Sequence, residues 1–286
     1  MTKLKVSIIG AGGKMGARCS NNLLKQPERF EIFLVDQGQK GLASIRERGQ
    51  KPFEAADAVP GSDIVVLAVP DKLIQLISGD IVQLMTPGTG LIILDPAAAV
   101  ARELALRDDC TFAVVHPCHP SYFLDQNTEE ARQDYFGGAG GKQDIVMARI
   151  QGDDAVFSQC IAVSQAMFTP VEHVYTMGIR DIAFLEPTLV ELLGATCLHA
   201  MAETVNKAVE RGIDKQAAIS FFTGHIYNLS ANFLGLLGDT PVSDACKVAI
   251  SLGNKLVLRD DWQNIWDDAV LDRVIATMLH PDKPQI

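Results

Sequence analysis

The chain has 286 residues, of which 48% are hydrophobic, and its formal net charge is −10 at pH 7. This length accommodates one large domain or two ordinary domains with a sizeable core. The acidic balance makes nucleic acids and anionic membrane surfaces poor partners.

Neither a targeting segment nor a membrane segment is expected. Met1 and Thr2 lead straight into the first predicted strand, which leaves no place for a secretory signal. No apolar stretch approaches the ~20 residues of a membrane helix. The six cysteines have no CxxC spacing, so we expect reduced thiols and neither a disulfide framework nor a zinc cluster. These features predict a cytoplasmic protein.

The first 36 residues carry the most specific pattern. Residues 3–9 form an apolar run rich in β-branched side chains, and they lead directly into the glycine turn 10–16 (GAGGKMG). A helical pattern follows, and a second apolar run, residues 31–35, ends in Asp36. Strand, glycine turn, helix, strand and terminal acid are the parts of a dinucleotide-binding βαβ unit. Glycines let the backbone approach a pyrophosphate, and N–H groups at the helix start attract its charge.

The choice of cofactor depends on the glycine spacing and on Asp36. Gly10, Gly12 and Gly16 give GxGxxxG, whereas Gly10, Gly13 and Gly16 give GxxGxxG, a variant often seen with NADP. An acid at the tip of the second strand accepts hydrogen bonds from the ribose hydroxyls and repels a 2′-phosphate, so we expect NAD. The alternative is a different α/β loop with chance glycines. The expected cofactor-binding residues are Gly10, Gly12, Gly13, Lys14, Met15, Gly16, Asp36, Val69 and Pro70.

Apolar runs alternate with helical patterns up to about residue 177. Residues 121–142 interrupt this pattern and are expected to form a long irregular excursion or lid. The alternation predicts an α/β fold with an N-terminal Rossmann domain built on a doubly wound parallel sheet. Further strands are predicted over residues 51–53, 62–69, 90–94, 111–115, 144–150 and 171–175, with helices over residues 72–85, 97–106 and 153–168.

Ligands of such sheets bind outside the carboxyl ends of the strands. Several polar or turn-forming residues follow the predicted strands directly, and they are therefore expected to surround one crevice. These residues are Gly10, Asp36, Pro70, Asp95 and His116.

The apolar runs that predict strands end near residue 178. Long helical patterns cover residues 180–211, 215–237, 242–258 and 268–279, and Pro187 interrupts the first of them. We therefore expect an NAD-binding Rossmann domain over residues 1–177 and an all-helical domain for substrate and dimerisation over residues 178–286. Several of these helices are apolar on more than one face, which predicts burial against a second copy in a homodimer.

His116 and His119 follow the strand at 111–115 and are separated by Pro117 and Cys118. Their position at a carboxyl end favours a general acid–base group or a metal ligand, with His116 as the catalytic residue and His119 as a substrate contact. The alternative is a rigid proline turn with incidental histidines.

Acidic side chains are rare in apolar helical runs unless they are paired or functional. Glu186 and Glu191 lie in such a run, FLEPTLVELLG. On an ideal α-helix, residues five apart are about 140° apart, so these two share no face unless Pro187 disturbs the turn. Glu191 is a candidate substrate contact, with a solvated side chain as the alternative.

A polar stripe crosses the predicted helix at 215–237. His225, Asn228 and Asn232 follow at i, i+3 and i+7, which places them on one face. The stripe predicts contacts with a polyhydroxylated substrate or hydrogen bonds within a buried interface, and the sequence leaves both open.

A βαβ dinucleotide unit followed by an all-helical domain resembles the 6-phosphogluconate dehydrogenase-like superfamily. Its relatives include β-hydroxyacid dehydrogenases, prephenate dehydrogenases and ketol-acid reductoisomerases. The β-hydroxyacid dehydrogenases carry a lysine at the start of the first long helix of the second domain. Counting back from Met201-Ala202-Glu203, that position falls near Glu186, so lysine-assisted oxidation is not expected here.

Acids in that helix are similar to those of ketol-acid reductoisomerases, whose carboxylates hold a divalent metal for an alkyl shift. The resemblance implies an NAD-dependent oxidoisomerase that acts on a branched sugar acid and couples hydride transfer to rearrangement. It implies Glu186 as a second catalytic residue, and His116 with Glu186 as ligands of Zn²⁺ or Mg²⁺. The alternatives are a simple hydroxy-acid dehydrogenase and a non-catalytic NAD sensor.

Overall fold

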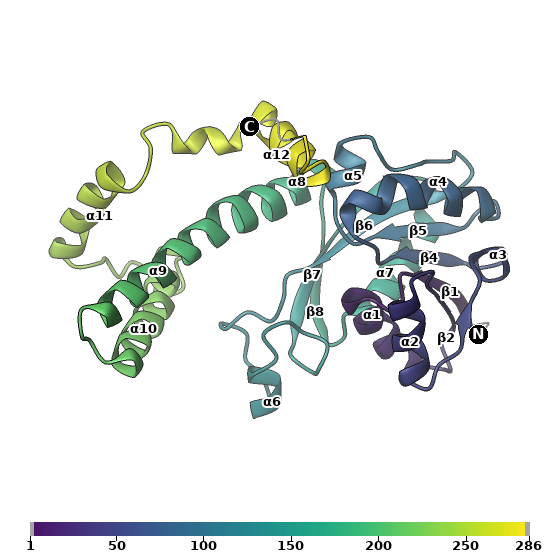
Figure 1. The fold of residues 1–286 in the computed structure, drawn as a ribbon, viewed down its shortest axis with the longest axis horizontal. Coiled ribbons are helices and arrows are strands. Elements are labelled where there is room, and N and C mark those ends of the chain that lie inside the picture. Colours follow the sequence, from purple (N-terminus) through teal and green to yellow (C-terminus); the bar gives the residue numbers. More distant parts are fainter. Residues whose placement is uncertain (1–2, 284–286) are drawn as a thin grey trace. The chain divides into compact units, whose positions relative to one another are not determined.

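The computed structural model describes residues 3–283 and divides the chain into two compact units (Figure 1). The first unit comprises Met1–Leu185 together with Asp272–Ile286, and the second comprises Glu186–Leu271. The division therefore falls inside the long helical stretch after residue 178, and the last helix returns to the first unit.

The first unit is built on one eight-stranded sheet with the order β3-β2-β1-β4-β5-β6-β7-β8 (Figure 1). Strands β1 to β6 pair in parallel, as does the pair β7 and β8. The predicted α/β class is confirmed. The strands are β1 (Leu4–Ile9), β2 (Phe30–Val35), β3 (Pro52–Phe53), β4 (Ile64–Leu67), β5 (Gly90–Ile93), β6 (Thr111–Pro117), β7 (Gln143–Gln151) and β8 (Val171–Thr176).

The expectation of an all-parallel sheet is corrected at one place, because β7 runs antiparallel to β6. A parallel pairing needs a crossover that passes over a face of the sheet. The segment between these strands holds only one short helix, α6 (Glu129–Arg132), so the chain returns along the edge it came from. The predicted excursion over residues 121–142 is this connection.

Helices cover the sheet. The helices of the first unit are α1 (Lys14–Leu24), α2 (Gln39–Glu47), α3 (Ala55–Ala58), α4 (Ile74–Leu84), α5 (Ala97–Val100), α6, α7 (Asp154–Met167), α8 (Ile179–Ala183) and most of α12 (Asp268–Leu279), with the 3-10 turn η1 (Asp71–Leu73) before α4.

Every residue of β4 and β5 is buried, as expected for strands covered on both faces. Cys19 of α1 and Cys160 of α7 both belong to the hydrophobic core. Burial raises the pKa of each thiol to about 12, so both stay protonated at neutral pH. None of the six cysteines forms a disulfide, as the sequence predicts.

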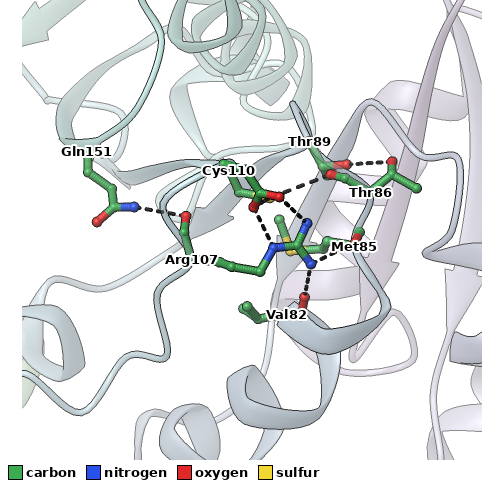
Figure 2. A network of polar contacts seen from close by, with 8 residues as sticks. Val82, Met85, Thr86, Thr89, Arg107, Cys110 and Gln151 are labelled. Atoms are coloured by element: carbon green, nitrogen blue, oxygen red, sulfur yellow. Dashed lines mark hydrogen bonds and ion pairs between the residues drawn. The ribbon is translucent and has the colours of Figure 1, made fainter.

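Arg107 is the centre of a network of polar contacts that joins the end of α4 to the segment before β6 and to the end of β7 (Figure 2). Its guanidinium donates to the carbonyl oxygens of Val82 and Met85 at the end of α4, at 2.9 and 2.8 Å, and pairs with Asp109. A cation at a helix C-terminus is favourable because the last carbonyls carry partial negative charge. The backbone carbonyl of Arg107 in turn accepts a hydrogen bond from Gln151 at the end of β7.

The helical stretch after Gly178 contains an unusual segment. It consists of α8, a π-helix η2 (Phe184–Ala195) and α9 (Thr196–Glu210). Pro187 lies inside the π-helix and does not begin a new helix. Proline removes a backbone donor and clashes with the preceding turn of an α-helix, which explains why the wider π geometry is found here.

The same stretch, Ile179–Glu210, is long and apolar enough to meet the criterion for a membrane span, which the sequence prediction did not foresee. This is weak evidence, since core helices of soluble proteins meet the same criterion.

The second unit has little core of its own. Its helices are η2, α9, α10 (Lys215–Phe233) and α11 (Asp244–Leu256), followed by the 3-10 turn η3 (Trp262–Trp266). Between Glu186 and Leu271 only Pro187, Thr188, Ala231 and Leu271 are buried. Large apolar side chains are exposed along α10 and α11, among them Phe221, Phe233, Val248, Leu252 and Leu256.

Candidate functional site

The glycine turn between β1 and α1 is shaped by close backbone contacts. Gly10 has a φ of +82°, and a Cβ there would lie 2.5 Å from the carbonyl oxygen of Ala68. A Cβ on Gly16 would lie 2.1 Å from the carbonyl oxygen of Gly10, and one on Gly12 would lie 2.2 Å from that of Gly41. Only glycine fits these positions. The turn thus brings the backbone N–H groups at the start of α1 to a surface that a pyrophosphate can reach.

The carboxylate of Asp36 is held in place at the tip of β2. Its Oδ2 accepts the N–H of Gly12 at 3.0 Å, and its Oδ1 accepts the N–H of Gly38 at 2.9 Å. A Cβ on Gly41 would lie within 2.4 Å of this carboxylate, so α2 can begin beside it only because residue 41 is glycine. The acid is therefore fixed before any cofactor binds.

A pocket of about 340 Å³ lies over these elements. Five of the predicted cofactor-binding residues line it: Gly10, Gly13, Asp36, Val69 and Pro70. Of the other four, Gly12 and Gly16 make the close contacts described above. Lys14 and Met15 form the first turn of α1. Asp95 and His116, predicted for the same crevice, are not among the residues that line this pocket.

The sequence prediction missed the wall that α4 contributes. Leu76, Ile77, Asp80 and Ile81 of α4, together with Leu73 at the end of η1, line the same pocket as Asp36. Leu76 is 69% exposed, although it is a large apolar side chain. An apolar face turned toward a pocket is what an adenine ring requires. The signal in the sequence is the helical spacing of apolar residues just after the strand that ends in Pro70.

Replacing Asp36 with alanine is expected to raise the KM for NAD about tenfold or more, because Asp36 is the residue expected to accept hydrogen bonds from the ribose hydroxyls. The ratio of kcat/KM values for NAD and NADP should fall, since the repulsion of the 2′-phosphate is removed. Steady-state kinetics with both cofactors measures this change. Asp57→Asn, on the exposed surface of α3, is the control and should leave the ratio unchanged. Wild-type turnover as good with NADP as with NAD would contradict the expected preference for NAD.

Backbone carbonyls hold both predicted histidines in the first unit. His116 in β6 has Nδ1 3.0 Å from the carbonyl oxygen of Leu94, and His119 has Nδ1 2.8 Å from that of Phe136. A carbonyl oxygen can only accept, so Nδ1 carries the hydrogen in each ring. In the neutral tautomer Nε2 then has the lone pair, which is what a general base requires.

The π-helix changes the expected relation between Glu186 and Glu191. Its hydrogen bonds join residues five apart, so residues i and i+5 lie one above the other on the same side of the helix. The two acids therefore share a face, whereas an ideal α-helix would separate them. Glu186 is half-buried and Glu191 is exposed. Both belong to the second unit.

The polar stripe on α10 is present, but its members have different surroundings. His225 donates from Nδ1 to the carbonyl oxygen of Phe221 at 2.7 Å and stacks on its ring. His225 and Asn228 line an open hollow together with Ser220, Phe221 and Gly224. Asn232 instead donates to the carbonyl oxygen of Thr240 beyond the helix end.

Comparison with known proteins supports these observations. Residues 124–279 match the family described as the C-terminal domain of phosphogluconate dehydrogenase (decarboxylating). The D-apionate oxidoisomerase of Blautia hydrogenotrophica is 68% identical over 287 residues, covering 100% of both chains. The D-apionate oxidoisomerase of Pectobacterium atrosepticum is 37% identical over 281 residues, covering 97% of this chain and 96% of that protein.

Solved structures show the same architecture. A semialdehyde dehydrogenase NAD-binding protein from Cupriavidus necator, in complex with calcium and NAD, has a TM-score of 0.92 at 37% identity. The match covers 97% of this chain and 100% of that one. An NADH-preferring ketol-acid reductoisomerase from an uncultured archean has a TM-score of 0.68 at 15% identity, covering 98% of this chain and 84% of that one, which indicates a shared fold alone.

Proposed function

The chain belongs to the D-apionate oxidoisomerase family and carries the phosphogluconate dehydrogenase C-terminal domain, and from this membership we propose its reaction and the roles of its residues. It is an NAD-dependent oxidoreductase, and the predicted resemblance to the 6-phosphogluconate dehydrogenase-like superfamily is confirmed. The proposed reaction is the oxidation of D-apionate, a branched sugar acid, coupled to rearrangement of its carbon skeleton, in the cytoplasm.

The fixed carboxylate of Asp36 beside the glycine turn carries the oxidoreductase part of this proposal. NAD⁺, when bound, would supply the acceptor for the hydride of the substrate. Asp36 would hold its ribose hydroxyls, and the apolar residues of α4 would contact its adenine ring. The N–H groups at the start of α1 hold the pyrophosphate. These contacts supply binding and orientation, while the hydride chemistry belongs to the cofactor.

His116 takes the proton of the hydroxyl that is oxidised. Its Nδ1 is committed to the Leu94 carbonyl, so the proton moves to Nε2. Loss of that proton and of the hydride turns the alcohol into a ketone. His119, three residues on, contacts the substrate.

Glu186 serves the rearrangement. In the proposed step it removes the proton of a neighbouring hydroxyl, and the electron pair of that O–H forms a new carbonyl. A hydroxymethyl group on the carbon that carried this hydroxyl moves with its bonding pair to the first ketone carbon, whose oxygen takes up the proton. Glu191, on the same face of the π-helix, contacts the substrate hydroxyls. His225, Asn228 and Asn232 of α10 are proposed as further substrate contacts.

Purified protein incubated with D-apionate and NAD⁺ tests the reaction. Formation of NADH measured by absorbance separates an enzyme from an NAD sensor. Analysis of the product skeleton by carbon NMR then separates rearrangement from simple oxidation. NADH with an unrearranged product would support the simple hydroxy-acid dehydrogenase, and no NADH with any sugar acid would support the sensor.

A divalent ion is a separable part of the proposal. Within residues 3–283, no group of three or more His, Cys, Asp or Glu side chains is placed to hold a metal. Glu186 and Glu191 nevertheless offer oxygen donors of the kind that Mg²⁺ accepts, with substrate and water as further ligands. A bound ion would act there as a Lewis acid. The predicted pair of His116 and Glu186 stays a prediction, because these residues belong to different units.

Dialysis against EDTA is expected to lower turnover, and added Mg²⁺ is expected to restore it. The measurement is the rate of NADH formation at saturating NAD, with NAD affinity determined in parallel as the control. A fully active enzyme in excess chelator would contradict the metal and leave both carboxylates as acid–base groups.

The second unit is proposed to form a homodimer. Its helices expose large apolar side chains that a lone copy leaves in water, at an unfavourable free energy of about 25 cal/mol per Å². Light scattering is therefore expected to give twice the mass of one chain. Val248→Asp with Leu252→Asp, one turn apart on α11, should give monomers or unfolded protein. Leu106→Asp, an exposed apolar position in the first unit, should leave the dimer intact. A monomeric wild-type protein would contradict the proposal.

A further inference from the structure

The connection between β6 and β7 contains a loop of residues 134–141, named here the glycine loop. The carboxylate of Asp134 organises it by accepting three backbone N–H groups, from Gly137 and Ala139 at 2.8 Å and from Gly141 at 3.0 Å. Hydrogen bonds to an ionised acceptor are stronger than those between neutral groups. The loop therefore has a defined shape although it is irregular.

The glycine loop packs directly on the first two turns of α1. The ring of Phe136 has the ammonium of Lys14 3.8 Å from its centroid and the guanidinium carbon of Arg18 at 4.6 Å. A Cβ on Gly137 would lie 2.4 Å from Nη2 of Arg18, so the loop approaches the helix as closely as glycine allows. Lys14 is the first residue of the helix whose start is proposed to hold the pyrophosphate.

Arg18 is the buried residue at the centre of this contact. Its side chain is buried, with 8% of the residue exposed, and burial lowers the pKa of its guanidinium. Nη2 donates to Gln143 at 2.9 Å, whereas Nε and Nη1 have no hydrogen-bond partner within the described residues. The rings of Phe136 and Phe168 are their neighbours. Burying such donors is unfavourable unless the arrangement serves another purpose.

The other end of the same contact is His119. Its backbone has a φ of +60°, a conformation that non-glycine residues rarely adopt. The carbonyl oxygen of Phe136 accepts a hydrogen bond from Nδ1 of His119, and the ring centroids of the two residues lie 5.2 Å apart. Phe136 thus contacts the cofactor helix with its side chain and the imidazole with both its carbonyl and its ring.

We propose that Phe136 is a positioning residue that couples the occupied pyrophosphate site to the imidazole of His119. When the pyrophosphate fixes Lys14 and the first turn of α1, the ring of Phe136 is fixed with them. Its carbonyl then holds Nδ1 of His119, and Nε2 is presented to the substrate in one orientation. The inference rests on the proposed role of His119 as a substrate contact, and it gives the bound cofactor control over that contact.

Hydrogen exchange of the glycine loop tests the coupling without any turnover. Saturating NAD⁺ is expected to slow exchange at residues 134–141 in the wild type and not in Phe136→Leu. Phe136→Tyr keeps the ring and should keep the protection. Tyr135→Leu is the matched control, since Tyr135 is the neighbouring aromatic residue and is 82% exposed. The proposal would be overturned if NAD⁺ did not slow hydrogen exchange of residues 134–141 in the wild type. It would also be overturned if Tyr135→Leu lost this slowing to the same extent as Phe136→Leu.

A double-mutant cycle tests the link to His119. Phe136→Leu is expected to lower kcat/KM for D-apionate by about 10- to 100-fold and to alter its pH profile, because a small displacement of the imidazole suffices. His119→Asn removes the imidazole but tolerates the left-handed backbone. The double variant should be no worse than His119→Asn alone, since both changes remove the same contact. Additive losses would overturn the positioning role.

The two proposals fail in different ways. A fully active His119→Asn enzyme would refute the assigned contact, whereas cofactor-dependent protection of the loop would still be measured. If Phe136→Leu does not fold, Lys14→Met at saturating NAD⁺ replaces it, because it removes the cation over the ring and keeps the chain length. If NAD⁺ still slows hydrogen exchange of residues 134–141 in Lys14→Met, the proposed coupling is wrong.

Discussion

Glu186→Gln is expected to lower turnover by about 10³-fold or more while the affinity for NAD stays unchanged. Glutamine keeps the size and hydrogen-bonding capacity of the side chain and removes its ability to take up a proton. The NAD pocket is formed by β1, β2, the glycine turn and α4, all in the first unit, so cofactor binding should not respond. Turnover and NAD titration, measured on the same preparation, check both statements.

The matched control is Glu203→Gln, which neutralises an exposed carboxylate on α9 in the same helical unit. This variant should keep wild-type turnover. An active Glu186→Gln enzyme would remove Glu186 from the reaction. Loss of NAD binding in that variant would instead indicate a general structural effect.

His116→Ala is expected to lower turnover by about 10²-fold or more and to leave a folded protein that binds NAD. Alanine removes the base, and it also leaves the carbonyl of Leu94 without its side-chain donor, which costs about 1 kcal/mol of stability. The measurement is kcat together with the melting temperature.

His116→Asn separates these two effects. Its amide can donate to the Leu94 carbonyl, so the variant should recover the stability of the wild type without recovering turnover. Near-normal activity in either variant would show that His116 has only a structural role at the end of β6. Recovery of turnover in His116→Asn alone would point to the same conclusion.

The elements that local pattern determines were predicted well. Residues 64–69 form a continuous apolar run because β4 is buried on both faces, and Asp36 is found at the strand tip because the βαβ unit places it there. These inferences depend on spacing along a few consecutive residues. The same holds for the change from strands to helices near residue 178.

Features that depend on distant contacts were not predictable. The direction of β7 follows from the absence of a crossover, and the shared face of Glu186 and Glu191 follows from a π-helix that no residue pattern announces. The glycine loop was recognised as irregular, but its contact with Arg18 joins residues more than a hundred positions apart. Sequence spacing carries no information on such a pairing.

The antiparallel pairing of β6 and β7 has a consequence for how the protein could be re-engineered. Pro117 pairs with Ile145, so the polypeptide leaves and re-enters the sheet at neighbouring points. The residues between them therefore form a connection that begins and ends at adjacent positions of the sheet, and it carries both His119 and the glycine loop. A graft of this connection from a relative is therefore expected to need the matching residues at positions 14 and 18 of α1, because Phe136 packs on both.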